Sequence, residues 1–329
     1  MMSENSNEKT SNGEIKDVPF IPVISFPPDT EDNLIKKAFF SILVTILLAS
    51  ITAVSYLFFY PPSEEGATFK ESQMGSAAAI YNLLFLLGIV VIFSIVLYIM
   101  IKKRMINLLT IMQALLLGFV GGSVISFFLV LWFYEGLILL NNIVNLDFIF
   151  NSINNLIMVL EITINILFIV IGALIVLSIT STRFAKYRNP LLILLSATTG
   201  GFLGLSLGEI TPIILMVGFA IYDIFAVFKG PLKLITEELR NIVEEEGEEL
   251  KAKTGLLLGL GDLFFYSLAV GYSIAYLGWL PTFLVGVTLS IGATYTIGLV
   301  LKAKRKRALP ALPIPIFLSI GIIIFFYLI

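Results

Sequence analysis

The stretch LLLGLGDLFFYS, residues 256–267, places one carboxylate, Asp262, inside an otherwise apolar run. A charged group in the hydrocarbon part of a bilayer costs roughly 3 kcal/mol or more, and such residues usually face a bundle interior or water. The role of Asp262 therefore depends on whether this run lies within a membrane, and the composition of the rest of the chain answers that question.

The composition is typical of a polytopic membrane protein. Of 329 residues, 58% are hydrophobic and 13% are charged, and the mean hydropathy is +0.98, values outside the range of ordinary soluble domains. Because a helix needs about 20 apolar residues to cross a bilayer, the sequence predicts an all-α fold with nine transmembrane helices. Their expected ranges are 38–60, 77–101, 106–134, 156–179, 190–207, 210–228, 255–277, 280–301 and 309–328. The stretch 136–150, which contains several Asn residues, is expected at the membrane surface, with a tenth span as the alternative.

The distribution of basic residues predicts the orientation. With nine spans, 20 of the 21 Lys and Arg residues fall on one side of the membrane, and Lys70 alone falls on the other. Cytoplasmic segments carry the Lys and Arg excess. We therefore expect a multi-pass protein of the cell membrane with a cytoplasmic N-terminus and an extracytoplasmic C-terminus.

The predicted spans divide the chain into three parts. Residues 1–34 are polar and are expected to form a disordered cytoplasmic tail rather than a signal peptide. Residues 35–207 form an N-terminal bundle of five spans, and residues 208–329 carry the last four spans with a cytoplasmic loop at 229–254. The net charge of −2 gives no reason to expect a nucleic-acid partner.

Three carboxylates lie within predicted spans: Glu161, Asp223 and Asp262. Glu161 is close enough to a span end to reach the interface, with a proton-path or gating role as the alternative. Asp223 lies six residues before Lys229, and Asp262 lies nine residues after Lys253. At the rise of an α-helix these positions are about 9 and 14 Å inside the same membrane face. Their two spans run antiparallel and are consecutive, so we expect the carboxylates to meet.

Two adjacent carboxyl groups in a low-dielectric site share one proton over some pH range. In that state the carboxylate can take a proton from water while the carboxylic acid polarises a peptide carbonyl. The chain contains no His and no Cys, which excludes imidazole and thiolate chemistry. Two carboxylates make a poor zinc ligand set, and we expect neither a metal nor another cofactor. The alternative is a carboxylate-lined cation leak channel or a proton-coupled transporter, although the chain shows no internal repeat of the kind that many transporters have.

Several neighbouring residues are candidate site residues with structural alternatives. Gly259 and Gly261 bracket Leu260 and allow close backbone approach, which helix packing alone also explains. Tyr222 offers a hydroxyl beside Asp223, although aromatic residues in membrane helices commonly serve packing.

A third candidate segment is rich in proline and lies at the start of the last span. Pro310, Pro313 and Pro315, with Ala311 and Leu312 between them, delay the last helix. The segment is either a simple helix start or an extended strip that pairs with substrate backbone.

Three motifs occur together on the sixth, seventh and ninth spans: Tyr222-Asp223, Gly259-Leu260-Gly261-Asp262 and Pro310-Ala311-Leu312. In this respect the chain resembles the GxGD intramembrane aspartyl proteases. The segments FKGPLKLITEE and PALPIPI and the predicted orientation are similar to the presenilin branch.

The resemblance implies a catalytic pair, Asp223 and Asp262, and a site shaped by residues 310–313 that engages substrate. It further implies hydrolysis within transmembrane helices of protein or peptide substrates. The short loop at 229–254 lacks a hydrophobic autocleavage insert, as in a prokaryotic, archaeal-type homologue that needs no secretase subunits. The resemblance leaves homo-oligomerisation open.

Overall fold

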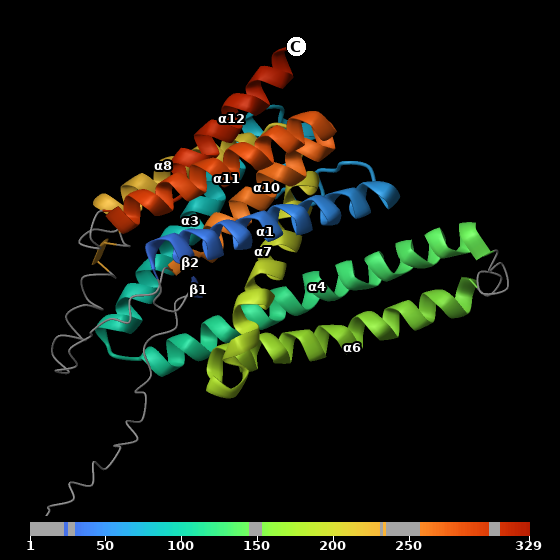
Figure 1. Ribbon diagram of the computed structural model, residues 1–329, viewed down its shortest axis with the longest axis horizontal. Helices are drawn as coiled ribbons and strands as arrows, with labels where there is room; N and C mark the ends of the chain where they lie inside the picture. Colours follow the sequence, from blue (N-terminus) through green and yellow to red (C-terminus); the bar gives the residue numbers. More distant parts are fainter. Residues whose placement is uncertain (1–22, 26–29, 145–152, 231–232, 235–256, 303–309) are drawn as a thin grey trace, which may run out of the picture.

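Nearly every long apolar run is helical in the computed structural model, which describes residues 23–25, 30–144, 153–230, 233–234, 257–302 and 310–329 (Figure 1). The helices of this part are α1 (Glu31–Phe59), α2 (Glu71–Met74), α3 (Ala77–Lys102), α4 (Ile106–Val144), α6 (Ile153–Thr180), the 3-10 helix η1 (Thr182–Tyr187), α7 (Arg188–Ser206), α8 (Thr211–Phe228), α10 (Leu260–Tyr276), α11 (Trp279–Lys302) and α12 (Pro313–Leu328).

Seven helices of the described residues, α1, α3, α4, α6, α7, α8 and α11, are long and apolar enough to cross a membrane. The protein is therefore a multi-pass membrane protein. Each of the nine predicted spans overlaps one helix, but α10 and α12 have only 17 and 16 residues. These two helices are shorter than a typical span, and the nine-span count and the orientation stay predictions.

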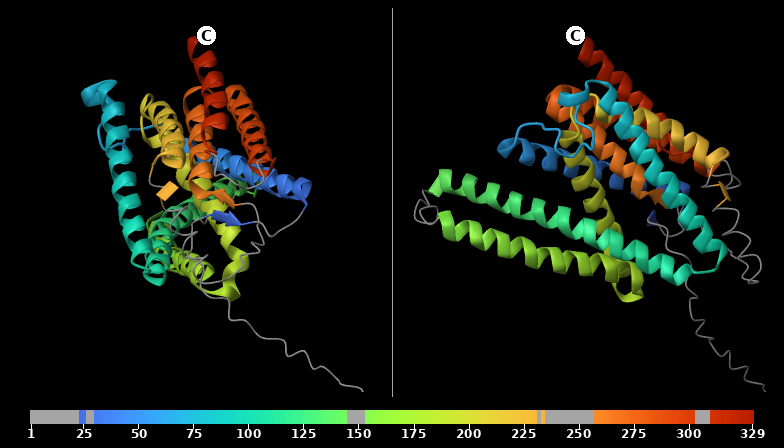
Figure 2. Two further views of the ribbon diagram at one scale, coloured as in Figure 1. Left: turned by 90° about the vertical axis from the view of Figure 1, so that its left-hand side faces the viewer. Right: turned by 180° about the vertical axis from the view of Figure 1, so that it is seen from behind.

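Helices α4 and α6 pack side by side along much of their length (Figures 1 and 2). Their backbones approach closely at Gly118 and Gly172, where a Cβ on either residue would lie 2.9 Å from the other residue's carbonyl oxygen. α4 continues without a break to Val144. The predicted end of this helix at residue 134 was wrong. Residues 135–144 are predominantly apolar and contain no proline, so the helix continues through them. Residues 145–150 of the surface segment predicted at 136–150 lie outside the described residues.

Helix α7 connects the α4–α6 pair with the remaining bundle, and α10 packs against it (Figure 1). Small residues allow this contact. A Cβ on Gly204 would lie 2.5 Å from the Leu268 carbonyl oxygen, and a Cβ on Gly271 would overlap the Gly201 carbonyl. Close backbone packing of this kind is the usual way in which membrane helices associate. It buries α10 between α7 and the helices on its other side.

Two short strands were not predicted. β1 (Val23–Ser25) pairs antiparallel with β2 (Leu257–Gly259), with Val23 opposite Gly259. The expected disordered tail at 1–34 was therefore wrong at β1 and at Glu31, where α1 begins, since backbone pairing and helix order these residues. Residues 1–22 and 26–29 lie outside the described residues. The predicted span at 255–277 begins as a strand, and its helix starts only at Leu260.

The connection between α1 and α3 holds the start of α8. The Ser63 N–H donates to the Leu205 carbonyl at 3.0 Å, next to the end of α7. The Glu71 carboxylate accepts the N–H groups of Ile210 at 3.0 Å and Thr211 at 2.6 Å. These N–H groups have no partner within the helix, and a carboxylate suits the positive end of the helix dipole. Glu71 thus fixes the helix that carries Asp223.

Candidate active site

Asp223 lies in the second half of α8, and its carboxylate contacts the segment before α12. Its Oδ2 atom accepts the N–H of Leu312 at 3.1 Å, and the N–H of Ala311 also donates to this carboxylate. The side chain is half-buried. Two backbone donors thereby hold one aspartate in a fixed orientation across two helices.

Asp262 lies in the first turn of α10, directly after β2. Gly259 is the N-cap residue, with extended dihedral angles of φ −65° and ψ 135°. The Gly259 N–H donates to the Asp262 carboxylate, as an acidic residue three positions after an N-cap commonly does. A Cβ on Gly259 would lie 2.7 Å from Asp262 Oδ2. The space at Gly259 is thus limited by the Asp262 carboxylate.

The other two residues of this motif have different surroundings. Leu260 packs against the main hydrophobic core. Gly261 is exposed, and a Cβ there would meet no atom within 4 Å among the described residues. The open side of α10 next to Asp262 is thus at Gly261.

Asp223 lies close enough to Asp262 for its charge to act on that carboxylate. Both side chains are half-buried, so each remains partly accessible from outside the helix bundle. α8 and α10 pack against one another, as expected for consecutive antiparallel spans. The pair can share one proton, and backbone N–H donors of the described residues orient each carboxylate.

The proline-rich segment is not the extended strip that one of the two interpretations expected. Leu312 has helical dihedral angles of φ −75° and ψ −40°, and α12 begins at Pro313. The reason is that Pro313 and Pro315 occupy the first turn, where a helix needs no N–H donors. Leu312 is buried and its N–H is already bound to Asp223. Pro310 and Ala311, which precede it, are half-buried.

Two tyrosines lie close to the pair. The Tyr222 ring packs on Phe219 at 6.3 Å between centroids, and its buried hydroxyl finds no hydrogen-bond partner among the described residues. Tyr266 was not singled out from the sequence. Its hydroxyl donates to the Ala311 carbonyl at 3.5 Å, and it lies four residues after Asp262, hence on the same helix face. That spacing was the only signal in the sequence that could have found it.

These features define a class: a multi-pass helical membrane protein with two interacting aspartates inside its bundle. Residues 238–329 match the family model named Presenilin. This range includes Asp262 and the segment 310–313, whereas Asp223 precedes it. The chain is thus similar to presenilins over part of its length.

Three curated presenilins match parts of the chain. The chain is 49% identical over 72 residues to Presenilin sel-12 of Caenorhabditis elegans, which covers 22% of the chain and 15% of the relative. It is 36% identical over 154 residues to Presenilin-B of Dictyostelium discoideum, covering 44% of the chain and 30% of the relative. It is 44% identical over 71 residues to the Presenilin homolog of Drosophila melanogaster, covering 22% and 12%. The matches thus span less than a third of each relative's length.

Proposed function

We propose that this protein is an intramembrane aspartyl protease that hydrolyses peptide bonds within transmembrane helices of its substrates. Asp223 and Asp262 are the catalytic pair of this proposal. The observation that carries it is that two half-buried aspartates, on the neighbouring helices α8 and α10, lie close enough for the charge of one to act on the other, and each accepts backbone N–H donors. The similarity of residues 238–329 to presenilins supports the same reaction class.

The pair supplies both proton-transfer roles. In the singly protonated state the ionised aspartate accepts a proton from water, and the protonated aspartate donates to the carbonyl oxygen of the scissile bond. The tetrahedral intermediate then collapses, and the departing nitrogen receives a proton from the pair. The bonds from Ala311 and Leu312 orient the Asp223 carboxylate, and the bond from Gly259 orients that of Asp262. The segment 310–313 thereby shapes the site, beside Tyr222 and the Gly259–Gly261 turn.

The substrate must change its conformation before it reacts. A peptide carbonyl within a helix is occupied by its own hydrogen bond, so the substrate helix has to open around the scissile bond. The exposed face at Gly261 leaves room next to Asp262 for such an opened segment.

The proposal includes a topology. We infer nine spans in which α10 and α12 are short members, with a cytoplasmic N-terminus and an extracytoplasmic C-terminus in the cell membrane. The basic residues support this orientation, because Lys102 at the end of α3 and Lys302 at the end of α11 then face the cytoplasm together. Residues 208–329 form the catalytic part in this arrangement.

The test uses purified protein in liposomes with a single-span substrate peptide carrying a fluorophore and quencher on either side of its apolar segment. Wild type is compared with Asp223→Asn and Asp262→Asn, and cation flux is recorded in the same liposomes. We expect wild type alone to release the fluorophore. Cation flux that depends on both aspartates, without any cleavage, would replace the protease with a leak channel.

A further inference from the structure

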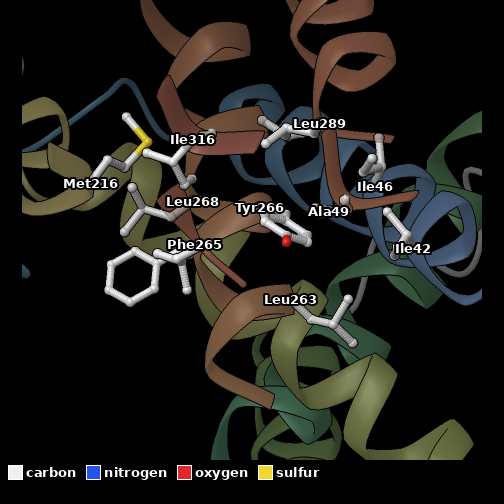
Figure 3. Packing of buried hydrophobic residues seen from close by; sticks show 14 of the residues in the cluster. Ile42, Ile46, Ala49, Met216, Leu263, Phe265, Tyr266, Leu268, Leu289 and Ile316 are labelled. Carbon is white, nitrogen blue, oxygen red and sulfur yellow. The ribbon is translucent and has the colours of Figure 1, made fainter. Parts of the chain in front are cut away.

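Tyr266 is a polar residue at the centre of the hydrophobic core. Its side chain is 1% exposed, and Figure 3 shows it surrounded by side chains such as Ala49 of α1, Leu289 of α11 and Ile316 of α12. A buried phenol needs a hydrogen-bond partner for its hydroxyl group. In this position, packing alone would be served by phenylalanine.

The partner of this hydroxyl belongs to the candidate site. Tyr266 donates to the Ala311 carbonyl oxygen at 3.5 Å, a long bond for this type. The Ala311 carbonyl and the Leu312 N–H are the two ends of one peptide unit, and that N–H donates to Asp223 Oδ2 at 3.1 Å. Because the peptide unit is planar, a bond at its oxygen restricts the direction of its N–H. The charges of Asp262 and Asp223 also act on Tyr266.

We propose that Tyr266 is a positioning residue of the aspartate pair. Its hydroxyl group fixes the orientation of the peptide unit between Ala311 and Leu312 through the Ala311 carbonyl. The N–H of that same peptide unit then orients the carboxylate of Asp223. Tyr266 thus links α10, which carries Asp262, to the partner carboxylate on α8. This role rests on the proposed protease function.

The test is Tyr266→Phe, which keeps the ring and removes the hydroxyl. We expect kcat to fall about fivefold, the effect of one neutral hydrogen bond of about 1 kcal/mol, with KM unchanged. Tyr272→Phe is the matched control. Tyr272 is on the same helix and 0% exposed, and its hydroxyl has no hydrogen-bond partner among the described residues. It should retain the kcat of wild type.

A double-mutant cycle tests the route through the peptide. Leu312→Pro removes the N–H that Asp223 accepts, and Leu312→Ala removes a similar amount of side chain while keeping that N–H. If the phenol acts through this peptide, Tyr266→Phe should lower kcat in the Leu312→Ala background but not in the Leu312→Pro background. Equal effects in both backgrounds, or a Tyr266→Phe enzyme with the kcat of wild type, would overturn the positioning role. An inactive wild type would instead overturn the proposed function.

A separate observation concerns the strand pair. β2 leads directly into Gly259 and Asp262, and β1 pairs with it so that Val23 lies opposite Gly259. β1 also packs against α7. Extended peptides commonly bind proteins by adding a strand to a sheet edge. We infer that β1 occupies the strand edge beside the catalytic pair and competes there with an opened substrate segment.

Two prolines in β1 test this competition. Neighbouring residues of an antiparallel ladder alternate in their hydrogen bonding, so Val23→Pro with Ile24→Pro removes a ladder donor whichever residue supplies it. We expect a lower KM for the single-span substrate than in wild type. The control replaces both residues with Thr, which is compatible with a strand. An unchanged or higher KM in the proline variant would overturn the competition, whereas an inactive wild type would overturn the protease function.

Discussion

At Gly259 the space for a side chain is limited by the candidate catalytic carboxylate. A Cβ would lie 2.7 Å from Asp262 Oδ2, closer than a carbon and an oxygen approach without displacement. Since the extended dihedral angles of Gly259 suit any residue, the absence of a side chain here is a requirement of the site rather than of the backbone.

We therefore expect Gly259→Ala to displace the Asp262 carboxylate and to lower kcat at least about tenfold, which corresponds to about 1.4 kcal/mol, while the fold is retained. Gly298→Ala on α11 is the control, because a Cβ there meets no described atom within 4 Å. Initial rates and thermal unfolding in detergent measure both effects. A Gly259→Ala enzyme as fast as the control would contradict this view of the turn.

The sequence predicted which residues would approach one another, but not how they are held. Asp223 and Asp262 could be paired because helix rise and the flanking lysines fix their depth. Tyr266 could not be distinguished from packing residues, since its role depends on a contact with Ala311, 45 residues away in the chain. The conformation of Leu312 depends likewise on a tertiary bond to Asp223.

Among the elements, the contact between α7 and α10 determines where Asp262 lies. Gly271 on α10 meets the Gly201 carbonyl of α7 without room for a Cβ. We expect Gly271→Ala to force the helices apart and to destabilise the fold by about 1–3 kcal/mol, the typical cost of overpacking. Gly321→Ala on α12 serves as the control, since a Cβ there has no described neighbour within 4 Å. Denaturation in mixed micelles compares the stabilities of the two variants. Equal stabilities would show that the contact between α7 and α10 tolerates a methyl group.

The start of α8 is the second element that positions the site. Glu71→Ala would leave the N–H groups of Ile210 and Thr211 without their acceptor, at a cost of about 1–3 kcal/mol. Glu65→Ala, in the same connection but with an exposed side chain, should have little effect. Hydrogen exchange in the first turn of α8 locates the change. Protection there equal to that of wild type would mean that Glu71 does not hold this helix.

Helices were predictable from apolar runs, whereas strands and helix ends were not. The three-residue strands β1 and β2 are too short to give a periodic pattern. α4 extends past the predicted end at 134 because no proline interrupts it before Val144. The connection of Glu71 to α8 joins residues far apart in the sequence, which no local pattern reveals.

For the whole molecule, the shared proton predicts a bell-shaped dependence of kcat/KM on pH. At low pH both aspartates are protonated and neither accepts a proton from water, and at high pH both are ionised and neither donates. Rates are measured across the pH range in which the fold is retained, with thermal unfolding as the check on stability. A rate that rises with pH to a plateau would mean that a single carboxylate acts as base without an acid partner.

The most direct test of the central claim is mass spectrometry of the products from a single-span substrate incubated with wild type, Asp223→Asn and Asp262→Asn. The protease account predicts fragments cut inside the apolar segment with wild type, and uncut substrate with either variant. Cleavage that persists in both variants, or fragments cut only outside the apolar segment, would contradict it.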